Sequence, residues 1–166
     1  MADVADLFRR LTVGVYVIGV AEGGRRNAFT AAWLVQVSFD PLLLALSVNP
    51  EHASHPLLVG GGGFVANVLR REQLHLARHF GTRSGRETDK LAGIAWRPAG
   101  GGAPILTDAL AWIECRLERR VTAGDHEIAI ARPVAGELLA PDAAPLAYAD
   151  TGDLDGSREL YPVSLG

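Results

Sequence analysis

Apolar and polar residues alternate along much of this chain with the two-residue period of half-buried β-strands. The alternation is regular over residues 110–121, where Trp112 and Glu114 fall on one side and Ile113 and Cys115 on the other. Other apolar stretches of strand length are bounded by turn residues. The pattern predicts roughly seven strands, among them residues 11–20, 28–39, 42–48, 64–69, 110–121 and 126–139.

Short helices are expected where the apolar residues recur every three or four positions instead. Residues 70–80 show this most clearly, with Leu74, Ala77 and Phe80 on the inner side. Further short helices are expected at residues 4–11, 53–59 and 88–94. Because strands outnumber helical crossovers, we expect a mainly β fold, a mostly antiparallel barrel with a few short helices, rather than a doubly wound sheet. No repeat or linker divides residues 1–166, so a single domain is expected.

Composition narrows the class of protein further. The chain has 166 residues, 48% of them apolar and 21% charged, which is typical of an ordinary globular protein. A net charge of −3 with scattered arginines argues against a nucleic-acid partner. The lone Cys115 excludes an intrachain disulfide and suits a reducing cytoplasm. The acidic N-terminus lacks signal-peptide features, and no apolar run is long enough to cross a membrane.

Residues 27–41 are the most informative stretch for function. Small and hydroxyl residues, Thr30, Ala31, Ala32 and Ser38, interrupt an otherwise apolar region there. Small side chains let a flat ligand approach the backbone closely, and hydroxyl and N–H groups then bond its edge or its phosphate. The stretch is therefore typical of a cofactor pocket.

Two sequence patterns that can mark a dinucleotide site or a metal site lack the neighbouring features that such sites require. Residues 61–66 fit a dinucleotide fingerprint ending in alanine, but that fingerprint needs a preceding strand and a following helix. Here the expected order is reversed, which favours a glycine turn. His75 and His79 stand four residues apart on a helix, yet no further ligand motif accompanies them. We interpret them as surface histidines and expect no metal.

Five other polar residues have an ordinary structural interpretation beside a functional one. Asn49, Ser54 and His55 fit either a capped helix or contacts to a ligand phosphate; a hydrolase is disfavoured because no nucleophile elbow is present. Asn67, inside a buried strand, favours a structural hydrogen bond over ligand contact. His126 follows a Gly-Asp turn, where an ordinary hairpin and a proton-carrying or hydrogen-bonding role are both open.

The segments together resemble the flavin reductase-like family, whose fold is the FMN-binding split β-barrel, related to Greek-key barrels. Each segment is weakly specific, but they come in family order and span nearly the whole chain. They are Phe8-Arg-Arg-Leu11, Gly14-Val-Tyr-Val17, Thr30 to Pro41, Val48-Asn49, Ser54-His55, Gly63 to Leu69, Leu76 to Phe80, Ala109 to Cys115, Gly124-Asp-His126 and Pro145 to Tyr148.

The resemblance implies a homodimer with FMN near the subunit interface, FAD being the alternative flavin. It implies that a first set of residues contacts the flavin ring and its ribityl chain. It implies that a second set approaches the ribityl phosphate or lies beneath or around the pocket. It also implies that His126 lies beside the nicotinamide. The first set is Thr30, Ala31, Ala32, Trp33, Gln36, Val37 and Ser38; the second is Asn49, Ser54, His55, Ala66, Asn67, Phe80, Arg83, Arg86 and Lys90.

The function that the resemblance implies is hydride transfer from NADH or NADPH to bound flavin, with His126 orienting the nicotinamide or helping to protonate reduced flavin. Reduced flavin would then serve a monooxygenase or another electron acceptor. The alternatives are a flavin-binding electron carrier without a nicotinamide site and a structural dimer without a cofactor. Ala32, Trp33 and Gln36 stand where serine or threonine is common in the family, which bears on the choice of electron donor.

Overall fold

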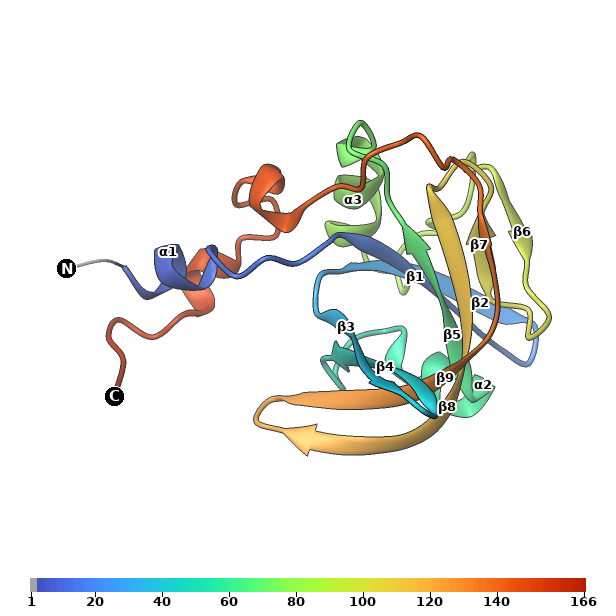
Figure 1. The fold of residues 1–166 in the computed structure, drawn as a ribbon, viewed down its shortest axis with the longest axis horizontal. Helices are drawn as coiled ribbons and strands as arrows, with labels where there is room; N and C mark the ends of the chain where they lie inside the picture. Colours follow the sequence, from blue (N-terminus) through green and yellow to red (C-terminus); the bar gives the residue numbers. More distant parts are fainter. Residues whose placement is uncertain (1–2) are drawn as a thin grey trace.

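The fold is a strongly curled antiparallel sheet, seen in a computed structural model that describes residues 3–166 (Figure 1). Seven strands form the sheet in the order β2-β1-β5-β8-β9-β4-β3, and two short strands form a separate hairpin. The bounds are β1 Tyr16–Glu22, β2 Arg25–Ala31, β3 Leu34–Phe39, β4 Leu42–Val48, β5 Gly63–Val68, β6 Trp96–Pro98, β7 Pro104–Leu106, β8 Ala111–Ala123 and β9 His126–Leu138.

The two edge strands of this sheet, β2 and β3, follow each other directly along the chain. The link Ala32-Trp33 therefore carries the chain from one edge to the other, and the curl of the sheet brings those edges together. No ladder joins β2 to β3, so the barrel stays split along that line. The mainly β, split-barrel fold expected from the sequence is confirmed, although residues 28–39 form two strands instead of one.

Three α-helices accompany the sheet within residues 3–166: α1 Val4–Phe8, α2 His55–Gly61 and α3 Leu74–Gly81. Helix α2 packs mainly on β1, and α3 packs on β2 and β1. Two 3₁₀ turns, η1 Tyr148–Thr151 and η2 Ser157–Leu160, lie in the C-terminal segment. The helix expected at residues 70–80 begins only at Leu74, because the Gln73 side chain bonds the backbone of Arg70 and Asp108.

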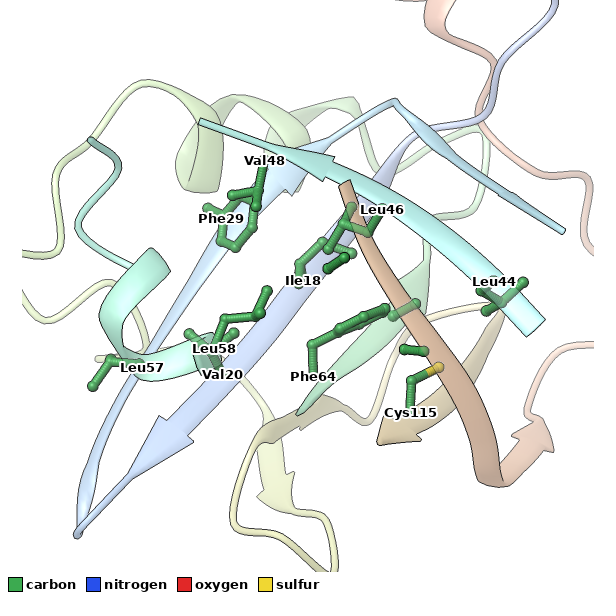
Figure 2. Close-up of a cluster of buried hydrophobic side chains, with 13 residues drawn as sticks. Ile18, Val20, Phe29, Leu44, Leu46, Val48, Leu57, Leu58, Phe64 and Cys115 are labelled. Carbon is green, nitrogen blue, oxygen red and sulfur yellow. The ribbon is translucent and has the colours of Figure 1, made fainter. Parts of the chain in front are cut away.

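Two apolar cores hold the sheet. One lies inside the curl, where Phe64 and Leu46 meet Ile18 from three strands and α2 adds Leu58 (Figure 2). The other lies under α3, around Phe80 and the neighbouring loops. Burial of such side chains stabilises the fold by roughly 1.5–3 kcal/mol each. The sheet that carries the candidate site is thus supported from both faces.

Three sequence expectations need correction. Residues 11–15 are not part of β1, and residues 88–94 form turns instead of a helix. The β6–β7 hairpin was missed because Pro98 and Pro104 lie in its three-residue strands and hide any period. The remaining boundaries differ from the expected ones by a few residues, as helix and strand ends commonly do.

Residues 3–11 and 148–166 form a terminal arm, most of which extends to one side of the sheet (Figure 1), while Tyr148 and Leu154 pack against the core under α3. Arg158 pairs with both Asp3, at 2.6 Å, and Asp6, at 2.8 Å. Arg9 pairs with Asp153 at 2.8 Å. These ion pairs are partly exposed, so each contributes little singly, but as a network they fix the N-terminal helix on the C-terminal segment.

Candidate functional site

The candidate site begins where β2 ends, next to the split in the barrel. Thr30 turns its hydroxyl to α3 and donates to the carbonyl of Ala77 at 2.7 Å. A Cβ at Gly81 would lie 3.3 Å from Thr30, so a glycine lets α3 come this close. A small cavity lies here. Its wall includes the end of β2 with the link that follows it, at Thr30, Ala31 and Ala32, and the C-terminal segment, at Tyr148 and Thr151.

Two loops close the next part of the site and are fastened to β2. Asn27 donates to the hydroxyl of Ser54 at 2.9 Å, and both side chains are buried. A Cβ at Gly85 would come within 2.2 Å of the Asn27 amide, so only glycine fits there. Arg86 donates to the carbonyl of Glu51 at 3.1 Å, which ties the loop after α3 to the loop before α2.

Positive charge gathers between these loops. Lys90, the only lysine of the chain, is 2% exposed and donates to the carbonyl of Phe80 at 3.1 Å. Its burial lowers its pKa to about 8. His52 packs on Phe29, and burial together with the charges of Lys90 and Arg86 lowers the pKa of His52 to about 4. At neutral pH His52 is therefore uncharged, while both cations remain.

A cavity of about 450 Å³ adjoins this cluster, lined by the β1–β2 turn and by the loop that follows α3. Asn27, Arg86 and Lys90 belong to its wall. Arg83 is exposed on the same loop. The wall also holds two further arginines and two acidic residues, Arg25, Arg26, Glu87 and Asp89. Because the cations outnumber the carboxylates, the pocket suits an anionic group, whose phosphate oxygens accept charge-assisted hydrogen bonds from arginine and lysine.

The edge strand β3 forms the other side of the site. Trp33, 52% exposed, holds its ring 5.0 Å from that of His126 at the tip of the β8–β9 hairpin. Further along β3 the register shifts between Gln36 and Ser38, a bulge that turns Val37 outward. Trp33 and His126 thus form an aromatic pair beside an irregular, exposed edge.

Among the residues expected at the site, Thr30, Ala31 and Ala32 line the small cavity and Arg86 and Lys90 line the larger one, whereas the side chains of four others lie in the core or pair with a neighbouring side chain. Ala66, Asn67 and Phe80 are buried, with side chains in the core rather than on a surface. The amide of Asn67 donates to the carbonyls of Val17 and Pro104 and accepts from the N–H of Leu106, so the structural interpretation is confirmed.

His55 is the fourth, since its ring lies 2.8 Å from the carboxylate of Glu127. Asn49 uses its side chain to accept from the N–H of Glu51. Whether any of these side chains also meets a ligand stays a prediction.

Several residues at the site were not expected. His52 was not among the expected site residues, and its packing on Phe29 has no local sequence signal. Tyr148 and Thr151 reach the pocket from the far end of the chain. A tyrosine beside Leu146 was the one available hint, because an apolar pair in a polar tail has to pack somewhere.

The histidines expected at the surface have distinct environments. His75 is exposed, whereas His79 is half-buried with its ring nitrogen 2.6 Å from the carbonyl of Lys90. Within residues 3–166 no group of three or more His, Cys, Asp or Glu side chains is placed to hold a metal ion. Over the same residues, none of the helices combines the length and hydropathy that a bilayer crossing requires.

Comparison with known proteins now decides the family. The family described as "Flavin reductase like domain" matches residues 8–156, which cover nearly the whole fold and every element of the site. The chain belongs to this flavin reductase-like family. The membership of the flavin reductase-like family that the sequence resemblance implied is thereby confirmed.

Individual relatives agree with this assignment. The flavin reductase-like chain is 40% identical over 141 residues to the high molecular weight rubredoxin of Moorella thermoacetica, an alignment covering 84% of this chain and 61% of that protein. Among solved structures, the NADH:FAD oxidoreductase SgcE6 of Streptomyces globisporus is similar with a TM-score of 0.80 and 26% identity, covering 87% and 86% of the two chains.

A second solved structure, the FMN-binding protein of Thermus thermophilus with bound p-hydroxybenzaldehyde, has a TM-score of 0.73 and 32% identity, covering 78% and 73%.

The residues present fit a flavin phosphate by their chemistry. Lys90 and Arg86 offer positive charge, and Gly81 and Gly85 let the loop lie close against β2. The flavin reductase-like domain therefore combines a cationic pocket, a run of small residues and an exposed aromatic pair, which succeed one another along β2 and the link that follows it.

Proposed function

We propose that this protein is an NAD(P)H:flavin oxidoreductase that binds FMN. The observation that carries the proposal is the succession of three features along β2 and the link that follows it: the cations Arg86 and Lys90 in the cavity beside Asn27, the small residues Thr30 to Ala32, and the pair of Trp33 with His126. A phosphate, a ribityl chain and a ring system need such surfaces in the same order. The flavin-containing names of the relatives support the same cofactor class.

In this proposal different residues contact the phosphate and the ring of the flavin. Lys90 and Arg86 hold the phosphate, and FMN is favoured over FAD because its terminal phosphate is a dianion. The backbone of residues 30–38 meets the edge of the ring, since small residues and the bulge leave its N–H groups accessible. Ser54 and Asn27 keep the loop before α2 in place.

The bound flavin supplies the redox chemistry by accepting hydride from a nicotinamide. The protein positions the two rings and excludes water. His126 lies on a rigid hairpin with Asp125 at 2.8 Å from its Nδ1, so its other nitrogen is free to meet the carboxamide or to hold a proton. Trp33 gives the second ring an aromatic wall.

A second copy of the chain completes the site in this proposal. Strand β3 is an unpaired edge that exposes Trp33, Val35, Val37 and Phe39, the last being 88% exposed. An exposed apolar edge strand on a soluble protein is a partner surface or an aggregation hazard. Homodimerisation through this edge places the flavin near the interface.

An anaerobic titration with NADH and with NADPH tests the proposal. Loss of flavin absorbance at catalytic rates supports the oxidoreductase. Protein that keeps its flavin, resists both nicotinamides and is reduced by dithionite is an electron carrier instead, and colourless protein that fails to bind FMN refutes both. We place the reaction in the cytoplasm, with a monooxygenase or another electron carrier as acceptor; the rubredoxin name of the Moorella relative favours a carrier.

A further inference from the structure

Glu127 occupies the position where the β8–β9 hairpin leaves the sheet. Strand β9 pairs with β4 from Ala131 to Glu127, and the pair of Glu127 with Val48 is the last. Beyond it, His126 pairs only with Ala123 inside the hairpin itself. The tip that carries His126 is therefore held by the hairpin turn and by the contacts that the neighbouring Glu127 makes.

Side chains from two other elements meet the Glu127 carboxylate. His55, the first residue of α2, lies 2.8 Å from one carboxylate oxygen, and Arg120 on β8 lies 3.3 and 3.4 Å from the two oxygens. The His55 and Glu127 side chains are only 15% and 17% exposed. The hydrogen bond from His55 is the main reason that the pKa of Glu127 is lowered. Partly buried contacts of this kind are stronger than exposed ion pairs.

Successive residues of a strand point to opposite faces. Glu127 points to α2, and His126 points to Trp33 at the start of β3. The hairpin tip is thus clamped between α2 on one face and Trp33 on the other. Because Ser54, next to His55, is tied to Asn27, the clamp extends to the loop that borders the cationic pocket.

We propose that Glu127 is a positioning residue, which acts through His55 to hold His126 against Trp33. The assignment of His126 to the reaction rests on the proposed function, whereas the geometry of the clamp does not. Loss of the Glu127 carboxylate frees the hairpin tip, so His126 leaves the Trp33 ring without any change in the residues that hold the flavin phosphate.

The test uses the imidazole signals of the full chain without flavin, in ¹H–¹³C spectra. The His126 signals are identified by their loss in His126→Ala, and Trp33→Leu measures how far the indole displaces them. We expect Glu127→Ala to lose at least about half of that displacement, because ring-current effects fall steeply with distance from the aromatic ring. Glu127→Gln, which keeps an acceptor for His55, restores most of it.

Glu137→Ala is the matched control. Glu137 lies on β9, as Glu127 does, but its ion pair with Arg97 of β6 is exposed. This variant leaves the His126 signals in place. His55→Ala breaks the clamp from the other side and gives the same displacement as Glu127→Ala, which keeps the test decisive if Glu127→Ala fails to fold. A folded Glu127→Ala or His55→Ala variant with unmoved His126 signals overturns the proposal.

In flavin-loaded protein, Glu127→Ala lowers kcat/KM for the nicotinamide roughly 10-fold, as a misplaced reacting group does, with flavin Kd within about twofold of wild type. Flavin affinity that falls as much as kcat/KM assigns Glu127 to flavin binding and refutes its positioning role. If the protein oxidises no nicotinamide, the proposed function fails, and the imidazole spectra alone still decide the clamp.

Discussion

Replacing Lys90 by methionine should stabilise the flavin-free protein and weaken its affinity for FMN. Burial lowers the pKa of Lys90 from its ordinary 10.5 to about 8. That difference corresponds to about 3 kcal/mol of unfavourable free energy for holding the charged form in the fold at neutral pH. Methionine removes this cost but loses the hydrogen bond from the charged Lys90 ammonium to the Phe80 carbonyl, about 2 kcal/mol. The net gain is about 1 kcal/mol, or roughly 2–4 °C in Tm.

The pH dependence has a definite sign. Lys90 has a lower pKa folded than unfolded, so between pH 8 and 10.5 the unfolded chain binds more protons and the wild type gains stability as pH rises. The advantage of Lys90→Met is therefore complete below pH 8 and disappears above 10.5. Thermal melts of both proteins across this range measure it. Because Lys90 is the only lysine, one ¹³Cε resonance of labelled lysine reports its pKa directly.

Ligand affinity provides the functional half of this prediction. FMN, which carries the phosphate, should bind Lys90→Met roughly 10-fold more weakly, since a hydrogen bond between charged groups is lost. Riboflavin, which lacks the phosphate, should bind about as well as to wild type. Quenching of flavin fluorescence measures both. A Lys90→Met variant that is less stable than wild type at pH 7, or that loses riboflavin and FMN equally, refutes the reasoning.

Four further outcomes are expected. His126→Ala should slow flavin reduction by NAD(P)H in stopped-flow traces while leaving FMN affinity nearly unchanged; loss of flavin would show that the residue is misplaced. Asn67→Ala should lower the free energy of unfolding in urea by about 3–5 kcal/mol, because three buried backbone groups lose their partner; a change below about 1 kcal/mol would contradict this. Phe39→Asp should shift gel-filtration elution toward the monomer, and unchanged elution would exclude β3 from the interface. Cys115, whose pKa burial raises to about 12, should resist thiol reagents at pH 8 until urea unfolds the chain, and rapid native labelling would show that the thiol is accessible.

Hydrophobic periodicity was sufficient to predict the long strands of the sheet, and residue type was sufficient to single out the small-residue stretch at the pocket. The first half of β8 and of β9 carries the buried positions, Trp112 and Cys115 in β8 and Ala129 and Ala131 in β9, because one face packs on the core there. The segment from Thr30 to Ser38 stood out because small and hydroxyl residues interrupt an apolar stretch of the sequence there. In both cases the physical cause acts within a few residues, so it leaves a readable trace.

The features that the sequence pattern did not predict depend on contacts between distant parts of the chain. The break at Ala32-Trp33 has no local signal, since both halves are apolar and only the choice of partner strands divides them. His55 fitted a phosphate contact by its place at a helix start, but its partner is Glu127, far along the chain. Tyr148 reaches the pocket for a similar reason, because the tail folds back over β2 and α3.

The ion pairs of the terminal arm have a practical consequence for engineering. Asp3 pairs with Arg158, so residues near the two ends of the chain lie together, and the segment that precedes Arg158 lines the small cavity at the end of β2. An electron-donating domain tethered at either end would start from the same point and approach the flavin pocket along the same path. Circular permutation through a short bridge between the ends is equally accessible, as it is in domains whose termini are neighbours.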